Sequence, residues 1–233
     1  MDIRRFYSNQ DINDGTIELI DEEAYHLKKV LRAQIGDTVE VTNGLGNLYI
    51  GKVDSLKGDR VKVKINENHR FPKREGRFII APSLLRRNPM NLIIEKLSEL
   101  GVPEITPVLF NRTEIKPADK VVQKWEKIAI TSLKVNKRVW MSRINEPIYL
   151  QQLIDHYADV ERKIMLDIDG DRSNYAENRA DTIIVVGPPG DFIEQEKTAL
   201  HANGYTAANI NGGTLRVETA AITAAAIYMR QLN

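Results

Sequence analysis

The most informative stretch of this 233-residue chain is Val185-Val186-Gly187-Pro188-Pro189-Gly190-Asp191-Phe192. It completes the apolar run Ile183–Val186, the pattern of a strand buried on both faces of a parallel sheet. It then leads into a predicted helix over Phe192–Asn203, at whose start Asp191 and Glu194 fit a capping box. A strand that passes through a glycine turn into a helix places free backbone N–H groups at the carboxyl edge of the sheet, where open α/β folds bind ligands.

A second turn of the same kind is Asn209-Ile210-Asn211-Gly212-Gly213-Thr214-Leu215-Arg216. It leads into an alanine-rich helix predicted over Val217–Met229, and Glu218 lies beside the loop together with Arg216. Together the two loops predict a walled pocket. Two alternatives stay open: each loop is an ordinary strand-to-helix connection, and Arg216 and Glu218 are only a structural pair. Neither loop has the G-x-G-x-x-G or G-x-x-x-x-G-K-[ST] pattern of nucleotide-binding folds.

Strands and helices alternate along the chain from Arg77 onward. This alternation predicts an α/β domain over residues 71–233, with a mainly parallel sheet flanked by helices. The other expected strands are Phe78–Ala81, Glu104–Leu109 and Ile164–Ile168, and the other expected helices are Pro89–Leu100 and Ala118–Val135.

The first 70 residues show a different pattern. Short alternating runs separated by turn signals predict a small β-barrel or sandwich over residues 1–70. One helix is expected at Glu22–Leu31, with Leu27 and Val30 on its apolar face, and Glu67–Gly76 is the expected linker. The expected strands are Arg4–Tyr7, Thr16–Ile20, Thr38–Thr42, Leu48–Val53 and Arg60–Ile65.

The composition excludes several classes of protein. With 42% hydrophobic and 28% charged residues, the chain is typical of a soluble globular protein. No apolar run reaches the roughly 20 residues that a membrane span needs, and no secretory signal is recognisable at the N-terminus. The chain has no cysteine, which excludes disulfides, thiolate zinc sites, iron–sulfur clusters and a cysteine nucleophile. We therefore expect a cytoplasmic protein.

The net charge of +1 conceals an uneven distribution. Residues 75–145 carry 13 basic and 7 acidic side chains, and residues 146–233 carry 7 basic and 13 acidic ones. A basic middle region suggests a polyanionic partner such as RNA, although solvated helix faces whose charges happen to cluster would give the same count. The basic side chains suited to RNA contact are His26, Lys28, Lys29, Arg32, Arg86, Arg87, Arg112, Lys134, Lys137 and Arg138.

No metal site is expected. The four histidines are scattered without the spacing of metal ligands. Asp167, Asp169 and Asp171 alternate after a strand and offer oxygen ligands for Mg²⁺, but solvated loop carboxylates are the preferred interpretation. No G-x-S-x-G motif is present to indicate a serine hydrolase.

Several motifs resemble those of the RsmE-type ribosomal RNA uridine-N3 methyltransferases, within the SPOUT superfamily. The most specific are Gly187-Pro-Pro-Gly-Asp-Phe192, which resembles G-P-E-G-[GD]-F, and Leu215-Arg-Val-Glu-Thr-Ala220, which matches L-R-x-E-T-A. The supporting motifs are His26-Leu-Lys-Lys-Val-Leu-Arg32 with Gly36-Asp37, Glu95-Lys-Leu-Ser-Glu-Leu-Gly101, and Ile105-Thr-Pro107 with Asn111-Arg112-Thr113.

The resemblance implies a PUA-like β-barrel that helps to grip RNA, followed by a SPOUT domain with a C-terminal trefoil knot. It implies a homodimer that uses S-adenosylmethionine to methylate N3 of a uridine in 16S ribosomal RNA of the small subunit. Arg138 and Arg216 become the catalytic candidates, and Glu218 is expected to brace the knot. The implied cofactor-binding residues are Leu166, Val186, Gly187, Pro188, Pro189, Gly190, Ile210, Asn211, Leu215, Arg216, Glu218, Thr219 and Ala220.

Three departures fall within these motifs. Pro189 stands where the family has Glu, Asn211 where it has Gly, and Thr214 where it has Arg or a similar residue. Pro189 removes a backbone N–H from the first loop, and Asn211 adds a side chain where glycine permits close approach. An alternative hypothesis is therefore a non-catalytic RNA-binding paralogue of the same fold. A Rossmann-type nucleotide-dependent enzyme ranks third because its fingerprint is absent.

Overall fold

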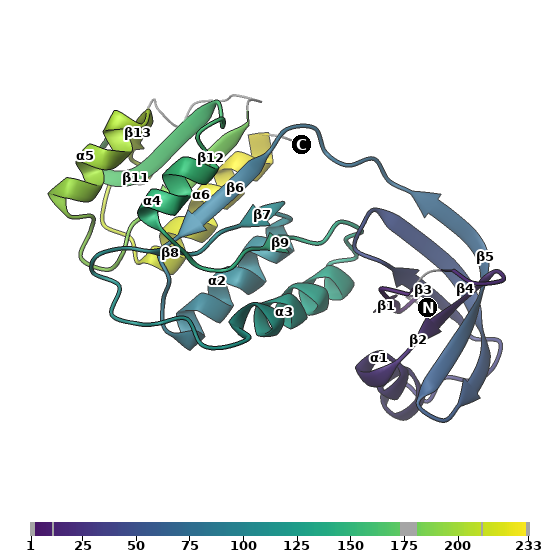
Figure 1. Cartoon of the computed structure of the whole chain (residues 1–233). Helices are drawn as coiled ribbons and strands as arrows, with labels where there is room; N and C mark the ends of the chain where they lie inside the picture. Colours follow the sequence, from purple (N-terminus) through teal and green to yellow (C-terminus); the bar gives the residue numbers. More distant parts are fainter. Residues whose placement is uncertain (1–2, 11, 173–180, 211, 232–233) are drawn as a thin grey trace. The chain divides into compact units, whose positions relative to one another are not determined.

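The computed structural model describes residues 3–10, 12–172, 181–210 and 212–231. Contacts divide the chain into two compact units. The first unit comprises Met1–Arg74 with Ile130–Met141, and the second comprises Glu75–Ala129 with Ser142–Asn233. Figure 1 labels the elements of each unit.

The first unit contains a five-stranded sheet with strand order β1-β3-β4-β5-β2. β1 pairs with β3 in parallel, and the other neighbours are antiparallel. The alternation in β5 turns Val61 and Val63 into the core, where both are fully buried. The elements are β1 (Arg5–Tyr7), β2 (Thr16–Leu19), α1 (Asp21–Tyr25), β3 (Thr38–Thr42), β4 (Asn47–Lys57) and β5 (Arg60–Arg70).

The helix predicted over Glu22–Leu31 is wrong in its second half. α1 ends at Tyr25, and a π-helical turn, η1 (His26–Val30), follows it. The wider turn breaks the 3.6-residue spacing on which the prediction relied, so that Leu27 is buried but Val30 is 57% exposed. The predicted linker at Glu67–Gly76 also starts too early, because β5 stays paired with β4 as far as Arg70.

The second unit contains a six-stranded sheet with strand order β13-β11-β12-β6-β7-β9, and every neighbouring pair is parallel. This confirms the predicted parallel sheet flanked by helices. The strands are β6 (Phe78–Pro82), β7 (Glu104–Ile105), β9 (Arg143–Ile144), β11 (Arg162–Asp171), β12 (Thr182–Val186) and β13 (Tyr205–Ala208), and a separate pair is formed by β8 (Val108–Leu109) and β10 (Ile148–Tyr149). The helices of this unit are α2 (Arg87–Leu100), α4 (Leu150–His156), α5 (Glu194–Ala202) and α6 (Val217–Gln231). The residues of α3 (Val121–Val135) are divided between the two units, and those from Ile130 onward belong to the first.

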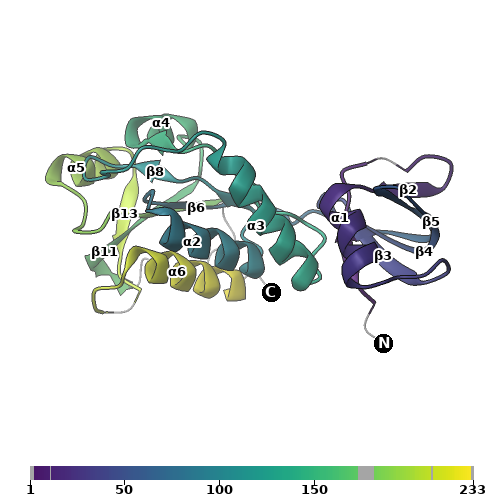
Figure 2. The same ribbon diagram turned by 90° about the horizontal axis from the view of Figure 1, so that it is seen from below.

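Helices cover both faces of this sheet (Figures 1 and 2). On one face, Ile79 of β6 and Ile183 of β12 join a core cluster with Leu153 of α4 and Leu200 of α5. On the other face α2 and α6 lie side by side, and the ring of Phe78 stacks on Tyr228 of α6 with centroids 3.9 Å apart. Because both faces are covered, the ligand-accessible part of the sheet is its carboxyl edge.

Several predicted element boundaries in this unit are wrong. Glu104–Leu109 is two strands in different sheets, interrupted at Pro107, which lacks a backbone N–H. α3 begins at Val121 rather than Ala118. α5 begins at Glu194 rather than Phe192, with Ile193 as its N-cap residue, and the backbone N–H of Ile193 donates to Glu196 Oε2 at 3.0 Å. The predicted capping box of Asp191 and Glu194 is therefore absent.

Candidate functional site

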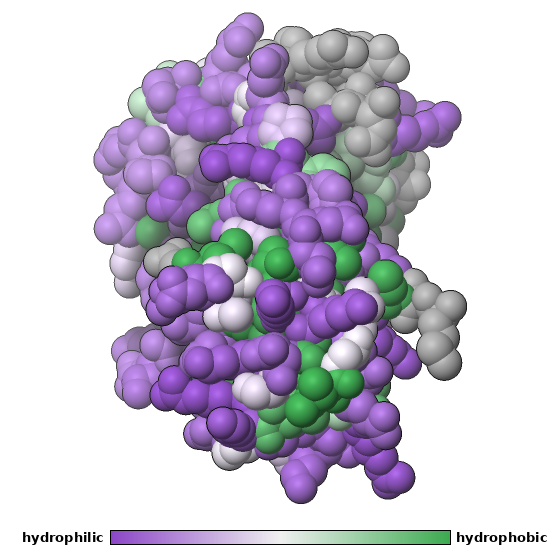
Figure 3. All heavy atoms as spheres, turned by 90° about the vertical axis from the view of Figure 1, so that its right-hand side faces the viewer, coloured by the Kyte–Doolittle hydropathy of each residue, from purple (hydrophilic) through white to green (hydrophobic). Residues whose placement is uncertain are grey.

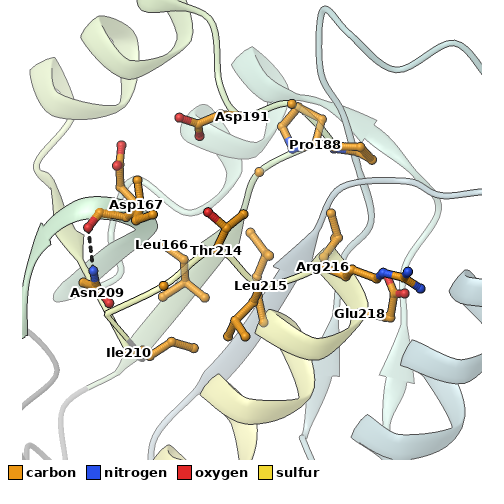
Figure 4. Close-up of a pocket in the computed structure, with 18 of the residues that line it drawn as sticks. Leu166, Asp167, Pro188, Asp191, Asn209, Ile210, Thr214, Leu215, Arg216 and Glu218 are labelled. Carbon is orange, nitrogen blue, oxygen red and sulfur yellow. Dashed lines mark hydrogen bonds between the residues drawn. The ribbon is translucent and has the colours of Figure 1, made fainter.

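A cavity of about 600 Å³ lies beside three neighbouring strands of the second unit (Figure 4). It is bordered by the ends of β12 and β13, by the part of β11 where its pairing with β12 stops at Leu166, and by the first turn of α6. Its lining residues are Leu166, Asp167, Ile168, Val186, Gly187, Pro188, Pro189, Gly190, Asp191, Ala208, Asn209, Ile210, Gly213, Thr214, Leu215, Arg216, Val217, Glu218 and Ala220.

The loop after β12, residues 187–191, is shaped by close packing. A Cβ atom at Gly187 would lie 2.9 Å from the ring of Phe192, so only glycine fits there. Phe192 is 4% exposed, and its ring packs edge-on against Phe110 with centroids 5.3 Å apart. Gly190 has a φ of 85°, in the left-handed region. The loop is thus anchored to the core directly beside the cavity.

Arg112 fixes the same loop from outside. Its Nη1 donates to the backbone carbonyl of Gly190 and, at 3.1 Å, to that of Asp191. The sequence suggested Arg112 only as an RNA contact. Its position shows a structural role at the cavity, through carbonyl groups that no sequence motif reveals.

An ion triad joins two walls of the cavity. Lys197 Nζ of α5 lies 2.6 Å from Asp167 Oδ2 of β11 and 3.0 Å from Asp191 Oδ2. Hydrogen bonding to Asp167 raises the pKa of Lys197 to about 12. Burial alone would raise the pKa of Asp167, but hydrogen bonds from Lys197 and from the backbone N–H of Asp169 hold it below its usual value. Both groups therefore carry their charges at neutral pH.

The side chain of Asn209 links the loop after β13 to β11 by hydrogen bonds. Its Nδ2 donates to the carbonyl of Ile168, and its Oδ1 accepts from the backbone N–H of Gly212 at 2.6 Å. In Figure 4, Asp167 and Asn209 lie at one end of the cavity, and Arg216 and Glu218 lie at the other. Apolar side chains, among them Leu166, Ile210 and Leu215, lie between these polar ends.

The cavity brings together most of the cofactor-binding residues implied by the resemblance. Thr219 is exposed and is not part of the lining, and Asn211 lies outside the described residues. Asp167, within β11, and Asn209, directly after β13, also line the cavity, although neither is among the residues that the resemblance implies. The implied residues that do line the cavity are Leu166, Val186, Gly187, Pro188, Pro189, Gly190, Ile210, Leu215, Arg216, Glu218 and Ala220.

Arg138 is not among the lining residues. It belongs to the first unit, where its backbone carbonyl accepts from Arg5 Nη1 at 3.1 Å. Burial lowers the pKa of its guanidinium. A cation in such surroundings interacts strongly with any anion that reaches it, because less water screens the charge.

The other residues suggested for RNA contact fall in both units. His26, Lys28 and Lys29 lie on η1, followed by Arg32, and Lys28 Nζ donates to the carbonyl of Gly58. In the second unit, Arg86 and Arg87 are exposed at the start of α2. Their exposure leaves Arg86 and Arg87 accessible to a polyanion.

No group of three or more His, Asp or Glu side chains within the described ranges is arranged to hold a metal ion. Asp167, one of the three alternating aspartates, is paired with Lys197. No helix of the described residues has the length and apolarity that a membrane crossing requires.

Comparison with known proteins gives a consistent result. The model of the RNA methyltransferase domain family matches residues 72–229, and the model of the RNA methyltransferase PUA domain matches residues 19–66. The ribosomal RNA small subunit methyltransferase E of Synechocystis sp. is 23% identical, over 100% of this chain and 78% of the relative. The protein of the same name from Bacillus subtilis is 25% identical, over 93% of this chain and 91% of the relative.

Solved structures share the fold. A structure from Legionella pneumophila, solved with the bound cofactor SAM, has a TM-score of 0.88 and 25% identity over 97% of both chains. The ribosomal RNA small subunit methyltransferase E from Neisseria gonorrhoeae, bound to S-adenosyl methionine, has a TM-score of 0.85 and 24% identity over 97% of this chain and 96% of that one.

These matches confirm the SPOUT-type α/β fold and the PUA-like domain that the sequence predicted, while the trefoil knot stays a prediction. The methyltransferase-domain model covers more than half of the chain and contains every residue that lines the cavity. The chain therefore belongs to the RNA methyltransferase family, in the group of RsmE-type proteins.

Proposed function

We propose that this protein uses S-adenosylmethionine to methylate N3 of a uridine in 16S ribosomal RNA of the small subunit. The observation that carries the proposal is the cavity beside β11, β12 and β13, because it lies at the ligand-binding edge of the sheet in a member of an RNA methyltransferase family. The RsmE-type relatives support ribosomal RNA as the substrate.

The cavity suits S-adenosylmethionine in size and in chemistry. Its volume of about 600 Å³ falls within the usual range of small-molecule sites. Leu166, Ile210 and Leu215 offer apolar surface to an adenine ring, and the polar groups at the two ends suit the ribose and the amino-acid part. When bound there, S-adenosylmethionine supplies an electrophilic methyl group.

Two arginines are the candidates for stabilising charge on the substrate. A uridine nitrogen must lose its proton to accept a methyl group, and negative charge then develops on the ring oxygens. Arg216, exposed at one end of the cavity, is placed to stabilise that charge. Arg138 is the second candidate, because its guanidinium is partly withdrawn from water.

The proposed function includes a role for each domain and an oligomeric state. Residues 1–70 act as the RNA-binding domain and residues 71–233 as the methyltransferase domain with a knotted C-terminal segment. The protein acts as a homodimer in the cytoplasm, without a metal ion.

Transfer of tritium from labelled S-adenosylmethionine to small subunits that lack the modification tests this function. We expect label in 16S ribosomal RNA that co-elutes with 3-methyluridine after digestion. Arg216→Ala should lower kcat by about 10²-fold to 10³-fold, the effect of removing one charge-stabilising donor. Lys124→Ala, an exposed change on α3 outside the cavity lining, should leave kcat unchanged.

The absence of incorporation by folded protein that binds the cofactor would overturn the proposal. Label in a different nucleoside would overturn the N3 assignment alone.

A non-catalytic RNA-binding paralogue is the second candidate, because Pro189, where the family motif has Glu, removes a backbone N–H donor from the first cavity loop. Titration calorimetry separates the two candidates. Heat on addition of S-adenosylmethionine or S-adenosylhomocysteine supports the enzyme, whereas RNA binding without such heat supports the paralogue.

A further inference from the structure

Five basic side chains lie on the outward surface of the β4–β5 hairpin. Val61 and Val63 are fully buried, so the alternating residues of β5 point away from the core. The register places Lys52 of β4 opposite Lys64 and Lys57 opposite Arg60. We call this surface the basic face, and its members are Lys52, Lys57, Arg60, Lys62 and Lys64, all of them exposed.

Acidic groups compensate this charge only in part. Glu18 of β2 lies 3.0 Å from Arg60 Nη1 and 3.6 Å from Lys62 Nζ. Two acids of the hairpin, Asp54 and Asp59, make no ion pair with the basic face within the part of the chain that the structure describes, and a third, Glu67, lies 3.1 Å from His69. Lys52, Lys57 and Lys64 likewise have no ion-pair partner among the described residues. The basic face therefore carries a clear excess of positive charge.

The arrangement of these cations costs stability. Lys52 and Lys64 are directly opposite each other on antiparallel strands, where Cβ atoms are about 4.5–5.5 Å apart and like charges repel. An opposite charge at either position would relieve this repulsion. A polyanion that binds to this surface would also relieve the repulsion between the two lysines.

The spacing of the cations indicates which polyanion fits. Arg60, Lys62 and Lys64 follow one another at every second residue of a strand, roughly 7 Å apart, in an extended row. Such a row suits a chain of regularly repeated anions. Lys28, whose Nζ donates to the carbonyl of Gly58 in the hairpin turn, adds a further basic residue beside it.

A protein partner fits this surface poorly. The cores of protein interfaces are enriched in aromatic and other apolar side chains and depleted in charged ones. The exposed large hydrophobic residues of the first unit lie outside β4 and β5; among the described residues they are Ile12, Tyr25, Val30, Ile35, Leu45, Phe71 and Val135. In Figure 3, hydrophilic residues cover most of the visible surface and hydrophobic ones form separate patches.

We propose that the basic face binds the phosphate backbone of the substrate RNA without reading its base sequence. The inference rests on the proposed function for the identity of the RNA. It assigns an RNA-binding role to five residues that the sequence motifs leave unassigned, and it makes the strand surface of the hairpin, in addition to η1, the RNA-contacting part of the first unit.

The experiment uses the full chain and a protein-free 16S ribosomal RNA transcript as the probe. Lys52→Glu with Lys64→Glu is the test variant, and Lys116→Glu with Lys124→Glu, at exposed positions of the second unit, is its charge-matched control. We expect the test variant to bind RNA about tenfold or more weakly near 0.1 M salt. Its slope of log affinity against log salt should fall by about 1.4–1.8, the value for two lost phosphate contacts.

A single change separates lost binding from lost folding. Lys64→Glu alone places opposite charges across β4 and β5, so its Tm should equal or slightly exceed that of the native protein, by up to about 2 °C. Its RNA affinity should nevertheless fall. A variant that is at least as stable as the native protein and yet binds RNA less well cannot owe the loss to misfolding.

Three outcomes would overturn the inference: unchanged affinity in the test variant, an equal loss in the charge-matched control, or weakened binding with an unchanged salt slope. Capture of an acidic protein by this surface, with RNA affinity unaffected, would also reject RNA as its occupant. Because the readout is RNA affinity, the result is independent of whether methyl transfer occurs. Titration of S-adenosylmethionine into the same variants should give the native affinity.

Discussion

Lys197 Nζ of α5 lies 2.6 Å from Asp167 Oδ2 of β11. Both carboxylate oxygens of Asp167 are bonded within the protein, since its Oδ1 accepts from the backbone N–H of Asp169 at 2.9 Å. The same ammonium reaches Asp191 in the loop after β12. One cation thus fixes two walls of the cavity, which is therefore formed before any ligand binds.

Replacing Lys197 should loosen this arrangement. In Lys197→Met the side chain of Asp167, only 4% exposed, loses its counter-charge, so we expect a loss of about 1–3 kcal/mol in the free energy of unfolding. S-adenosylmethionine affinity should fall about tenfold, and Lys197→Arg should retain most of it. Chemical denaturation and calorimetry provide the measurements. A Lys197→Met protein with native cofactor affinity would contradict a positioning role.

The same pair sets a pH window for stability. The pKa of Asp167 is lower in the folded state, so its contribution is complete above the unfolded value of about 3.9 and is lost as the pH falls through the folded pKa. The pKa of Lys197 is raised to about 12, so its contribution is complete below about 10.4 and is lost as the pH rises through about 12. The stability difference between the native protein and Lys197→Met should be constant from about pH 5 to 10 and shrink outside that range. Urea denaturation across pH measures it, and an undiminished difference near pH 3 would argue against the pair.

Arg112 provides a test between two roles. If its main role is to hold the carbonyl of Gly190, Arg112→Ala should weaken S-adenosylmethionine binding about tenfold and leave the salt slope of RNA binding unchanged. Arg87→Ala, an exposed change at the start of α2, should do the opposite, with weaker RNA binding and native cofactor affinity. Calorimetry and RNA titration at several salt concentrations separate the two. A smaller slope of log RNA affinity against log salt in Arg112→Ala would instead support the RNA contact that the sequence suggested for Arg112.

Gly187 should tolerate no side chain while Phe192 is present. Gly187→Ala puts a methyl group 2.9 Å from that ring, and such overpacking typically costs about 1–3 kcal/mol. Cofactor affinity should fall with it, because the loop lines the cavity. Phe192→Leu should partly restore the cofactor affinity of Gly187→Ala in the double variant. Additive effects of the two changes would show that the ring is not the obstacle.

The two cavity loops were predictable from sequence because their information is local. A buried strand, a glycine turn and a helix are read from consecutive residues, as in Val185–Phe192. The groups that hold these loops were not predictable in the same way. Arg112 bonds to a carbonyl 78 residues away, and Lys197 meets Asp167 only because β11 and β12 are neighbours in the sheet. Val30 was placed wrongly because a π-helical turn changes the residue spacing within one short helix.

The stacking of Phe78 on Tyr228 also constrains how the protein is made. The strand that carries Phe78 opens the second unit, yet the ring of Phe78 has no stacking partner until the helix that carries Tyr228 has been synthesised. The first turn of that same helix completes the cavity. A chain truncated before Val217 would therefore leave the ring of Phe78 without its partner and would lack part of the cavity lining, so this unit completes its fold only after α6 has been synthesised.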